Sequence, residues 1–141
     1  MLEEWRDIED YEGLYQVSNF GRIKRMRFIN NMYNFPQERI MKKSLKTNGY
    51  EIVRLSKRGV KTTFMVHRLV AKAFIDNPSD YLEINHIDGN KTNNSVENLE
   101  WCSRSQNELH AWKNGLKKYT ELMKINLNKL NQRKKVKNVR N

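Results

Sequence analysis

The pattern of apolar and polar residues along the chain predicts a mixed α+β fold. Residues 15–24 alternate in polarity on either side of the turn Ser18–Gly21, and residues 49–66 do so around Lys57–Gly59. Alternation around short turns rich in Gly, Asn and Ser is typical of β-hairpins. Residues 26–38 have no clear period and contain Pro36, so we expect a loop there.

Helical spacing follows directly after the second hairpin. Apolar residues recur at steps of one, three and four through residues 67–75, and Asn77-Pro78 ends the pattern. A second amphipathic helix with a basic outer face is expected over residues 116–132. Residues 133–141 are so basic that we expect a disordered tail.

The segment Glu83–His110 combines a short strand, an asparagine-rich loop, a second strand and the start of a helix. The turn Asp88-Gly89-Asn90 separates the strands, and Ser105 and Glu108 have the spacing of a capping box. Such a unit can bring a histidine, a metal ligand and a helix close together in space. Within it we expect Asp88 to act in the turn rather than bind a metal.

Composition adds a strong indication of a polyanionic partner. The chain has 141 residues and a net charge of +11. Residues 18–75 carry fourteen Lys and Arg against two acids, and residues 116–141 carry nine against one, whereas residues 76–102 are acidic. Two basic blocks that flank an acidic one favour nucleic acid, with a divalent cation between them. The charge pattern does not separate DNA from RNA.

Other features limit the class of protein. The chain has one cysteine, Cys102, which excludes an internal disulfide and a multi-cysteine zinc site. No run of 18 apolar residues is present, so no membrane span is expected, and the acidic start has no secretory signal pattern. We therefore expect an intracellular protein that is not secreted.

Three segments together resemble a known family. Asn85-His86, Asn94, Asn98-Leu99 and Asn107 resemble the motif of HNH, or ββα-metal, endonucleases, especially the small phage and homing type. Residues 3–25 resemble the NUMOD type of DNA-binding motif found before such units, and residues 66–74 resemble the helix that precedes them. From this resemblance we expect the chain to have three parts: a β-rich DNA-binding region at 1–62, a nuclease domain at 63–115, and a basic helix and tail at 116–141.

The resemblance implies hydrolysis of DNA phosphodiester bonds with one Mg²⁺ or Mn²⁺ ion per site. His86 would be the general base and Asn98 would hold its strand and loop in place. Asn85 and Asn107 would bind the metal, with His110 as second choice for the helix ligand. Asn85 departs from the family pattern, which often has aspartate there, and a neutral ligand binds magnesium more weakly. His67 is expected to start the helix or contact phosphate rather than take part in catalysis.

Double-stranded DNA is the expected partner and a monomer the expected state. Phosphate contacts are expected from basic residues of the first block: Arg22, Lys24, Arg25, Lys42, Lys43, Arg54, Lys57, Arg58 and Lys61. Two alternatives stay open. One is a DNA-binding regulator that keeps the fold but does not cleave, for which Asn85 is the only hint, and the other is an RNA-binding protein.

Overall fold

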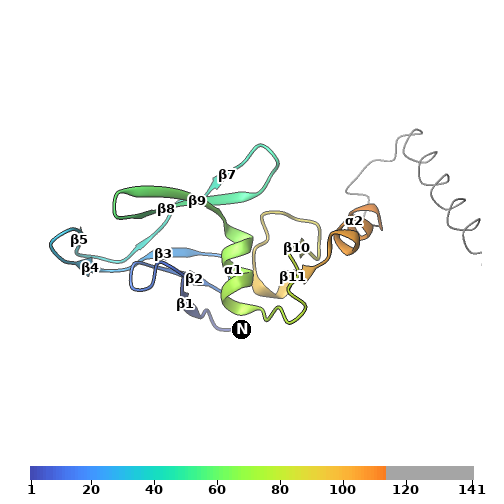
Figure 1. Cartoon of the computed structure of the whole chain (residues 1–141), viewed down its shortest axis with the longest axis horizontal. Coiled ribbons are helices and arrows are strands. Elements are labelled where there is room, and N and C mark those ends of the chain that lie inside the picture. The colour runs from blue at the N-terminus through green and yellow to red at the C-terminus, as the bar shows by residue number, and fades with distance from the viewer. Residues whose placement is uncertain (114–141) are drawn as a thin grey trace, which may run out of the picture. The chain divides into compact units, whose positions relative to one another are not determined.

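The computed structural model describes residues 1–113 (Figure 1). They form two compact units, Met1–Asn107 and the beginning of a second unit at Glu108. The basic helix and tail expected over residues 116–141 lie outside the described residues. No helix within residues 1–113 is long and apolar enough to cross a membrane.

The first unit contains four small antiparallel sheets. One has the order β1-β2-β3-β6, another has β7-β8-β9, and β4-β5 and β10-β11 each form a pair. The strands are β1 (Trp5–Asp7), β2 (Tyr15–Ser18), β3 (Ile23–Arg25), β4 (Phe28–Ile29), β5 (Asn34–Phe35), β6 (Arg39–Ile40), β7 (Ser44–Leu45), β8 (Glu51–Lys57), β9 (Val60–Met65), β10 (Glu83–His86) and β11 (Leu99–Cys102). The helices are α1 (Val66–Phe74), the 3₁₀ turn η1 (Val96–Asn98) and α2 (Arg104–Lys113). The mixed α+β fold predicted from the sequence is confirmed.

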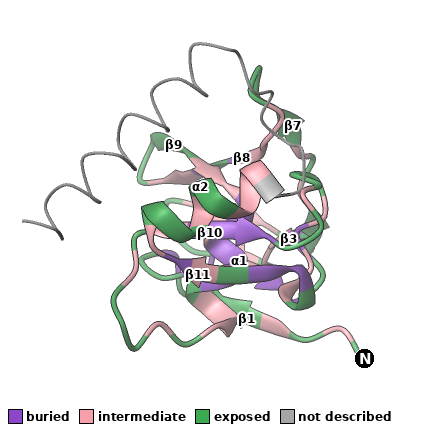
Figure 2. Cartoon of the chain, turned by 90° about the vertical axis from the view of Figure 1, so that its right-hand side faces the viewer, coloured by how far each residue is buried: buried purple, intermediate pink, exposed green. Residues whose placement is uncertain are grey.

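Helix α1 joins the sheets into one core. It lies between the β-rich region and the β10–β11 pair in Figure 1, and Figure 2 shows buried residues along it and the strands beside it. Its stripe of apolar residues explains this position, because such a face must be buried against other elements. The largest fully buried apolar residues come from both the first region and the helix: Val17, Ile23, Leu55, Val66 and Val70.

The expectation of a loop over residues 26–38 is wrong. This stretch holds β4 and β5, and β6 follows. The side-chain oxygen of Asn30 accepts hydrogen bonds from the backbone N–H groups of Met32 and Tyr33, at 2.8 and 2.7 Å, and so makes the turn. The Tyr33 ring contacts Phe28 of the opposite strand edge-on, with centroids 6.0 Å apart, and stacks on Phe35 at 5.7 Å. Cross-strand aromatic contacts such as the one between Phe28 and Tyr33 stabilise short strands that lack a clear period.

The start of α2 also differs from the sequence prediction. The capping box is formed by Ser103 and Gln106, not by Ser105 and Glu108. The Gln106 N–H donates to Ser103 Oγ at 3.2 Å, and the Ser103 N–H donates to Gln106 Oε1 at 3.0 Å. This reciprocal pair satisfies two N–H groups at the helix start.

The turn between β2 and β3 packs closely against the loop that follows β10. Gly21 has φ +84°, and a Cβ there would lie 2.9 Å from the backbone oxygen of Asn94. The N–H of Val96 donates to the carbonyl of Asn19 at 2.8 Å. The turn therefore holds the chain at Asn94 and at Val96, two residues later.

A buried polar side chain lies at the start of α1. His67 is 5% exposed, its ring stacks on Tyr50 with centroids 5.0 Å apart, and its Nδ1 has no hydrogen-bond partner. Burial, with smaller contributions from the charges of His86 and Arg68, lowers the pKa of His67 to about 4. The folded protein therefore holds this imidazole neutral.

We expect Gly21→Ala to destabilise the protein more than Gly13→Ala. Gly13 also has positive φ, +77°, but a Cβ there meets nothing within 4 Å. Both variants carry a backbone strain of about 1–2 kcal/mol, and Gly21→Ala adds a clash with Asn94. Denaturant unfolding measures the difference, and equal losses would show that the close approach to Asn94 contributes nothing.

Stability should decrease as the pH falls from 7 to 5. The pKa of His67 is lower in the folded protein than in the unfolded chain, so the unfolded chain binds the extra proton below pH 6.5. Linkage gives a loss of about 2 kcal/mol over this interval for a pKa near 4. His67→Phe should reduce the pH dependence measured by urea unfolding, and an unchanged slope would contradict the buried neutral state.

Candidate active site

His86 ends β10 and is buried, with 5% of its surface exposed. Its Nε2 lies 2.8 Å from the side-chain oxygen of Asn94, which is itself buried. Burial lowers the pKa of His86, while the bond to Asn94 and the charge of Asp88 oppose that change. The result is a neutral imidazole with one nitrogen held by an amide oxygen, and a neutral imidazole can accept a proton.

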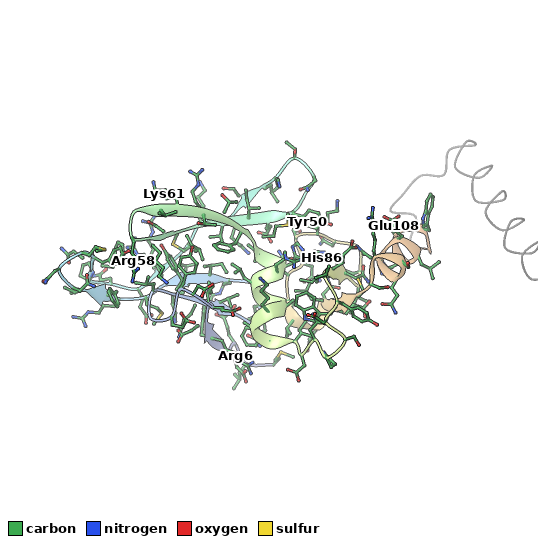
Figure 3. All side chains as sticks on the ribbon, in the orientation of Figure 1. Arg6, Tyr50, Arg58, Lys61, His86 and Glu108 are labelled. Atoms are coloured by element: carbon green, nitrogen blue, oxygen red, sulfur yellow. The ribbon has the colours of Figure 1, made fainter. Side chains whose placement is uncertain are left out.

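Two further rings surround His86. The His67 ring lies 5.0 Å from it and the Tyr50 ring 5.9 Å, measured between centroids. Figure 3 shows Tyr50 and His86 near each other, away from Arg58 and Lys61. His67 lies in the first turn of α1, near the expected helix start, but its ring belongs to the surroundings of His86, which sequence spacing gave no means of detecting.

Asn98 closes the loop between the two strands. Its side-chain oxygen accepts from the N–H of Asp88 at 2.9 Å, and its Nδ2 donates to Asp88 Oδ1 at 2.8 Å and to the carbonyl of Asn93 at 2.9 Å. Hydrogen bonds to the Asp88 carboxylate from the Asn93 side chain, from the N–H of Asn90 and from the Asn98 side chain lower the pKa of Asp88. Asp88 is thus engaged in the turn, and Asn98 ties the end of β10 to the start of β11.

Asn85 and Asn107 each contact a carboxylate. The Asn85 Nδ2 donates to Glu100 Oε1 at 2.9 Å, and Asn85 lies directly opposite Glu100 in the antiparallel ladder. The Asn107 Nδ2 donates to Glu83 Oε2, also at 2.9 Å. Glu83 and Asn85 are two residues apart in β10, so both point to one face of the ribbon. The four side chains therefore gather on that face.

This donor set fits a hard divalent cation. Because each Nδ2 donates to a carboxylate, the oxygens of Asn85 and Asn107 are the ends that can serve as ligands. Amide and carboxylate oxygens are the ligands that magnesium prefers, and Glu83 and Glu100 add negative charge. The contribution of these two glutamates was missed from the sequence, because only the strand register reveals it.

His86 follows Asn85 directly, so strand alternation turns its side chain to the other face, toward α1. The His86 imidazole thus lies on one face of the end of β10, and the amides of Asn85 and Asn107 lie on the other face. His110 belongs to the second unit, and its role as second choice for the metal stays a prediction.

Some of the expected phosphate-binding residues contact other groups of the protein, whereas the others are exposed or line a groove. Arg22, Lys24 and Lys43 each form an ion pair, with Glu3, Glu38 and Glu51 respectively. Lys57 donates to the carbonyl of Asp10, and Arg58 and Lys61 are exposed near the β8–β9 turn. Arg25, Lys42 and Arg54 line a groove of about 390 Å³, which Arg39 also borders.

Arg39 was not among the residues expected to contact phosphate. It directly follows residues 26–38, which the sequence indicated as a loop. No strand pattern therefore showed to which side of a sheet the Arg39 side chain would point. The pairing of Arg25 with Arg39 in the β3–β6 register brings both into the basic groove.

Comparison with protein families gives two matches. The NUMOD4 motif matches residues 3–56, and the HNH endonuclease family matches residues 64–109. The first therefore contains β1 to most of β8, and the second contains α1, β10, β11 and the start of α2.

Similar proteins come from a phage, a virus and a bacterial prophage. DNA endonuclease I-HmuI of Bacillus phage SP01 is 36% identical over 96% of this chain and 68% of its own length. An HNH endonuclease of Acanthamoeba polyphaga mimivirus is 42% identical over 84% of this chain, which spans 32% of that relative. A prophage-derived HNH homing endonuclease of Bacillus subtilis is 46% identical over 54% of this chain and 47% of its own length.

The fold matches a solved structure as well. A solved structure described as "DNA binding and cleavage by the HNH homing endonuclease I-HmuI" matches this fold with a TM-score of 0.72 and 34% sequence identity. The match covers 86% of this chain and 65% of the chain in that structure. Sequence, fold and motif order agree. The chain belongs to the HNH endonuclease family of the phage and viral homing type, with a NUMOD4 motif before its HNH segment.

Proposed function

We propose that this chain is a metal-dependent endonuclease that hydrolyses phosphodiester bonds in double-stranded DNA. The observation that carries the proposal is the neutral, oriented imidazole of His86 at the end of β10, directly after Asn85, whose amide, like that of Asn107, donates to a carboxylate. Family membership and the names of the relatives support the same reaction.

His86 is proposed as the general base. Its Nε2 is held by Asn94, so Nδ1 is the nitrogen that accepts a proton from the attacking water. Burial keeps the ring neutral before the reaction by lowering its pKa. Asn98 positions the base, because its hydrogen bonds fix the loop that begins at the residue after His86.

Asn85 and Asn107 are proposed to hold one Mg²⁺ or Mn²⁺ ion through their amide oxygens. When bound, the ion supplies Lewis-acid stabilisation of the phosphate charge and of the leaving oxygen. Glu100 and Glu83 orient the two amides by accepting their N–H bonds, and they compensate for the missing charge of an aspartate at position 85.

The DNA contact is proposed to include the basic groove between β3, β6 and β8. Arg25, Arg39, Lys42 and Arg54 line it, and four cations around one groove attract a phosphate backbone. Arg58 and Lys61 extend this charge along β8 and β9 (Figure 3). Arg22, Lys24, Lys43 and Lys57 have protein partners and are weaker candidates. A monomer inside the cell remains the expected state.

We expect the protein to nick or linearise supercoiled plasmid with Mg²⁺ and to be inactive with EDTA. His86→Ala should reduce the cleavage rate by about 10²–10⁴-fold, because the general base is lost, while gel-shift binding persists. Cleavage by this variant at the parent rate would show that another group is the base. Binding without cleavage by the parent protein itself would favour the alternative of a DNA-binding regulator, and tighter binding to RNA would favour an RNA-binding protein.

Removing the carboxylate opposite Asn85 should weaken metal binding. Glu100→Gln is expected to lower Mn²⁺ affinity about fivefold, equivalent to roughly 1 kcal/mol, because an adjacent negative charge is lost. Glu97→Gln is the matched control, since Glu97 is an exposed acid on η1, three residues before Glu100. Electron paramagnetic resonance of free Mn²⁺ measures the affinity, and equal affinities for the two variants would contradict the role of Glu100.

A further inference from the structure

His86 begins a chain of polar contacts that leaves the HNH segment. Its Nε2 lies 2.8 Å from Asn94 Oδ1, and Asn94 Nδ2 donates to Glu51 Oε1 at 2.9 Å. The other oxygen of Glu51 lies 3.2 Å from Lys43 Nζ, which also donates to the carbonyl of Gly21 at 3.1 Å. Glu51 begins β8, and Lys43 lies just before β7, so both come from the NUMOD4 match.

The chemistry of Glu51 decides which way the Asn94 amide points. A carboxylate only accepts hydrogen bonds, so the end of Asn94 that faces Glu51 must be its NH₂ group. The oxygen then faces His86 and can only accept. The hydrogen of the neutral imidazole is thereby placed on Nε2, and the lone pair on Nδ1.

Three features keep this arrangement in place. The Lys43 ammonium lies 3.2 Å from one oxygen of Glu51, whose side chain is only 14% exposed, so this ion pair fixes the position of the carboxylate. Lys43 is itself fixed by the carbonyl of Gly21. The close approach of Gly21 to the backbone of Asn94 limits the movement of the residue in the middle of the chain.

We propose that Glu51, held by Lys43, is a positioning residue that sets the tautomer of His86 through Asn94. This inference rests on the proposed function, because the tautomer matters when His86 is the base. It also gives the NUMOD4 segment a part in the chemistry as well as in DNA binding, and it assigns Lys43 to an internal ion pair instead of a phosphate contact.

The test compares Glu51→Met with Glu51→Gln in the full chain. Both replacements are close to glutamate in size, but only glutamine offers an oxygen to the Asn94 NH₂ group. Long-range ¹H–¹⁵N spectra of the histidine rings report which nitrogen carries the hydrogen. We expect the parent and Glu51→Gln to show His86 with hydrogen on Nε2, and Glu51→Met to show a mixture of the two tautomers.

Activity should follow the tautomer. The single-turnover cleavage rate of Glu51→Met is expected to fall by about 10-fold or more, as for other losses of a group that orients a functional histidine, with gel-shift affinity unchanged. Glu51→Gln should restore most of the rate. Glu38→Met is the control, because Glu38 also pairs with a lysine, Lys24, but lies on the exposed surface.

Two results would overturn the inference. One is a parent protein in which the His86 hydrogen is on Nδ1 or is shared between both nitrogens, a result that needs no variant to fold. The other is a folded Glu51→Met protein with the parental tautomer. Failure of the proposed function is a separate outcome, because then His86→Ala cleaves normally even if Glu51→Met shifts the tautomer.

Discussion

The hydrogen bonds of the Asn98 side chain are the constraint on which the site depends. Asn98 precedes β11, and its partner Asp88 lies two residues after β10, so one amide joins the ends of both strands. The same amide also binds the carbonyl of Asn93, next to the residue that contacts His86. An asparagine suits this position because its side chain both donates and accepts hydrogen bonds. An ionised aspartate of similar size only accepts them, and a leucine does neither.

The structure shows what two residues of the acidic part of the chain contact. Residues 76–102 are acidic, and two of their acids, Glu83 and Glu100, face the amides of Asn107 and Asn85. In the proposed function, the negative charge that relatives often carry at position 85 is thus supplied from the neighbouring strand. A carboxylate one strand away attracts a cation and leaves the amide to act as the ligand.

Local patterns in the sequence predicted the hairpins around residues 18–21 and 57–59, helix α1 and the β10–loop–β11 unit, because each follows a period or a turn signal. Other features escaped prediction. The β4–β5 hairpin depends on aromatic contacts, which have no period. The capping box uses Ser103 and Gln106, which have the same spacing in the sequence as the expected pair Ser105 and Glu108. Glu51, Glu83 and Glu100 join the site through strand register and long-range packing, which spacing along the chain does not encode.

The contacts of Asn94 show why the two family segments cannot be understood separately. Asn94 lies in the HNH match, yet the groups that hold it are Glu51 and the backbone of Gly21, both from the NUMOD4 match. A fragment that starts at residue 63 would keep every motif residue but would lose the carboxylate that orients the Asn94 amide. The amide could then turn by 180° and offer its NH₂ group to His86, which would favour the opposite tautomer. The first segment therefore completes the surroundings of the imidazole.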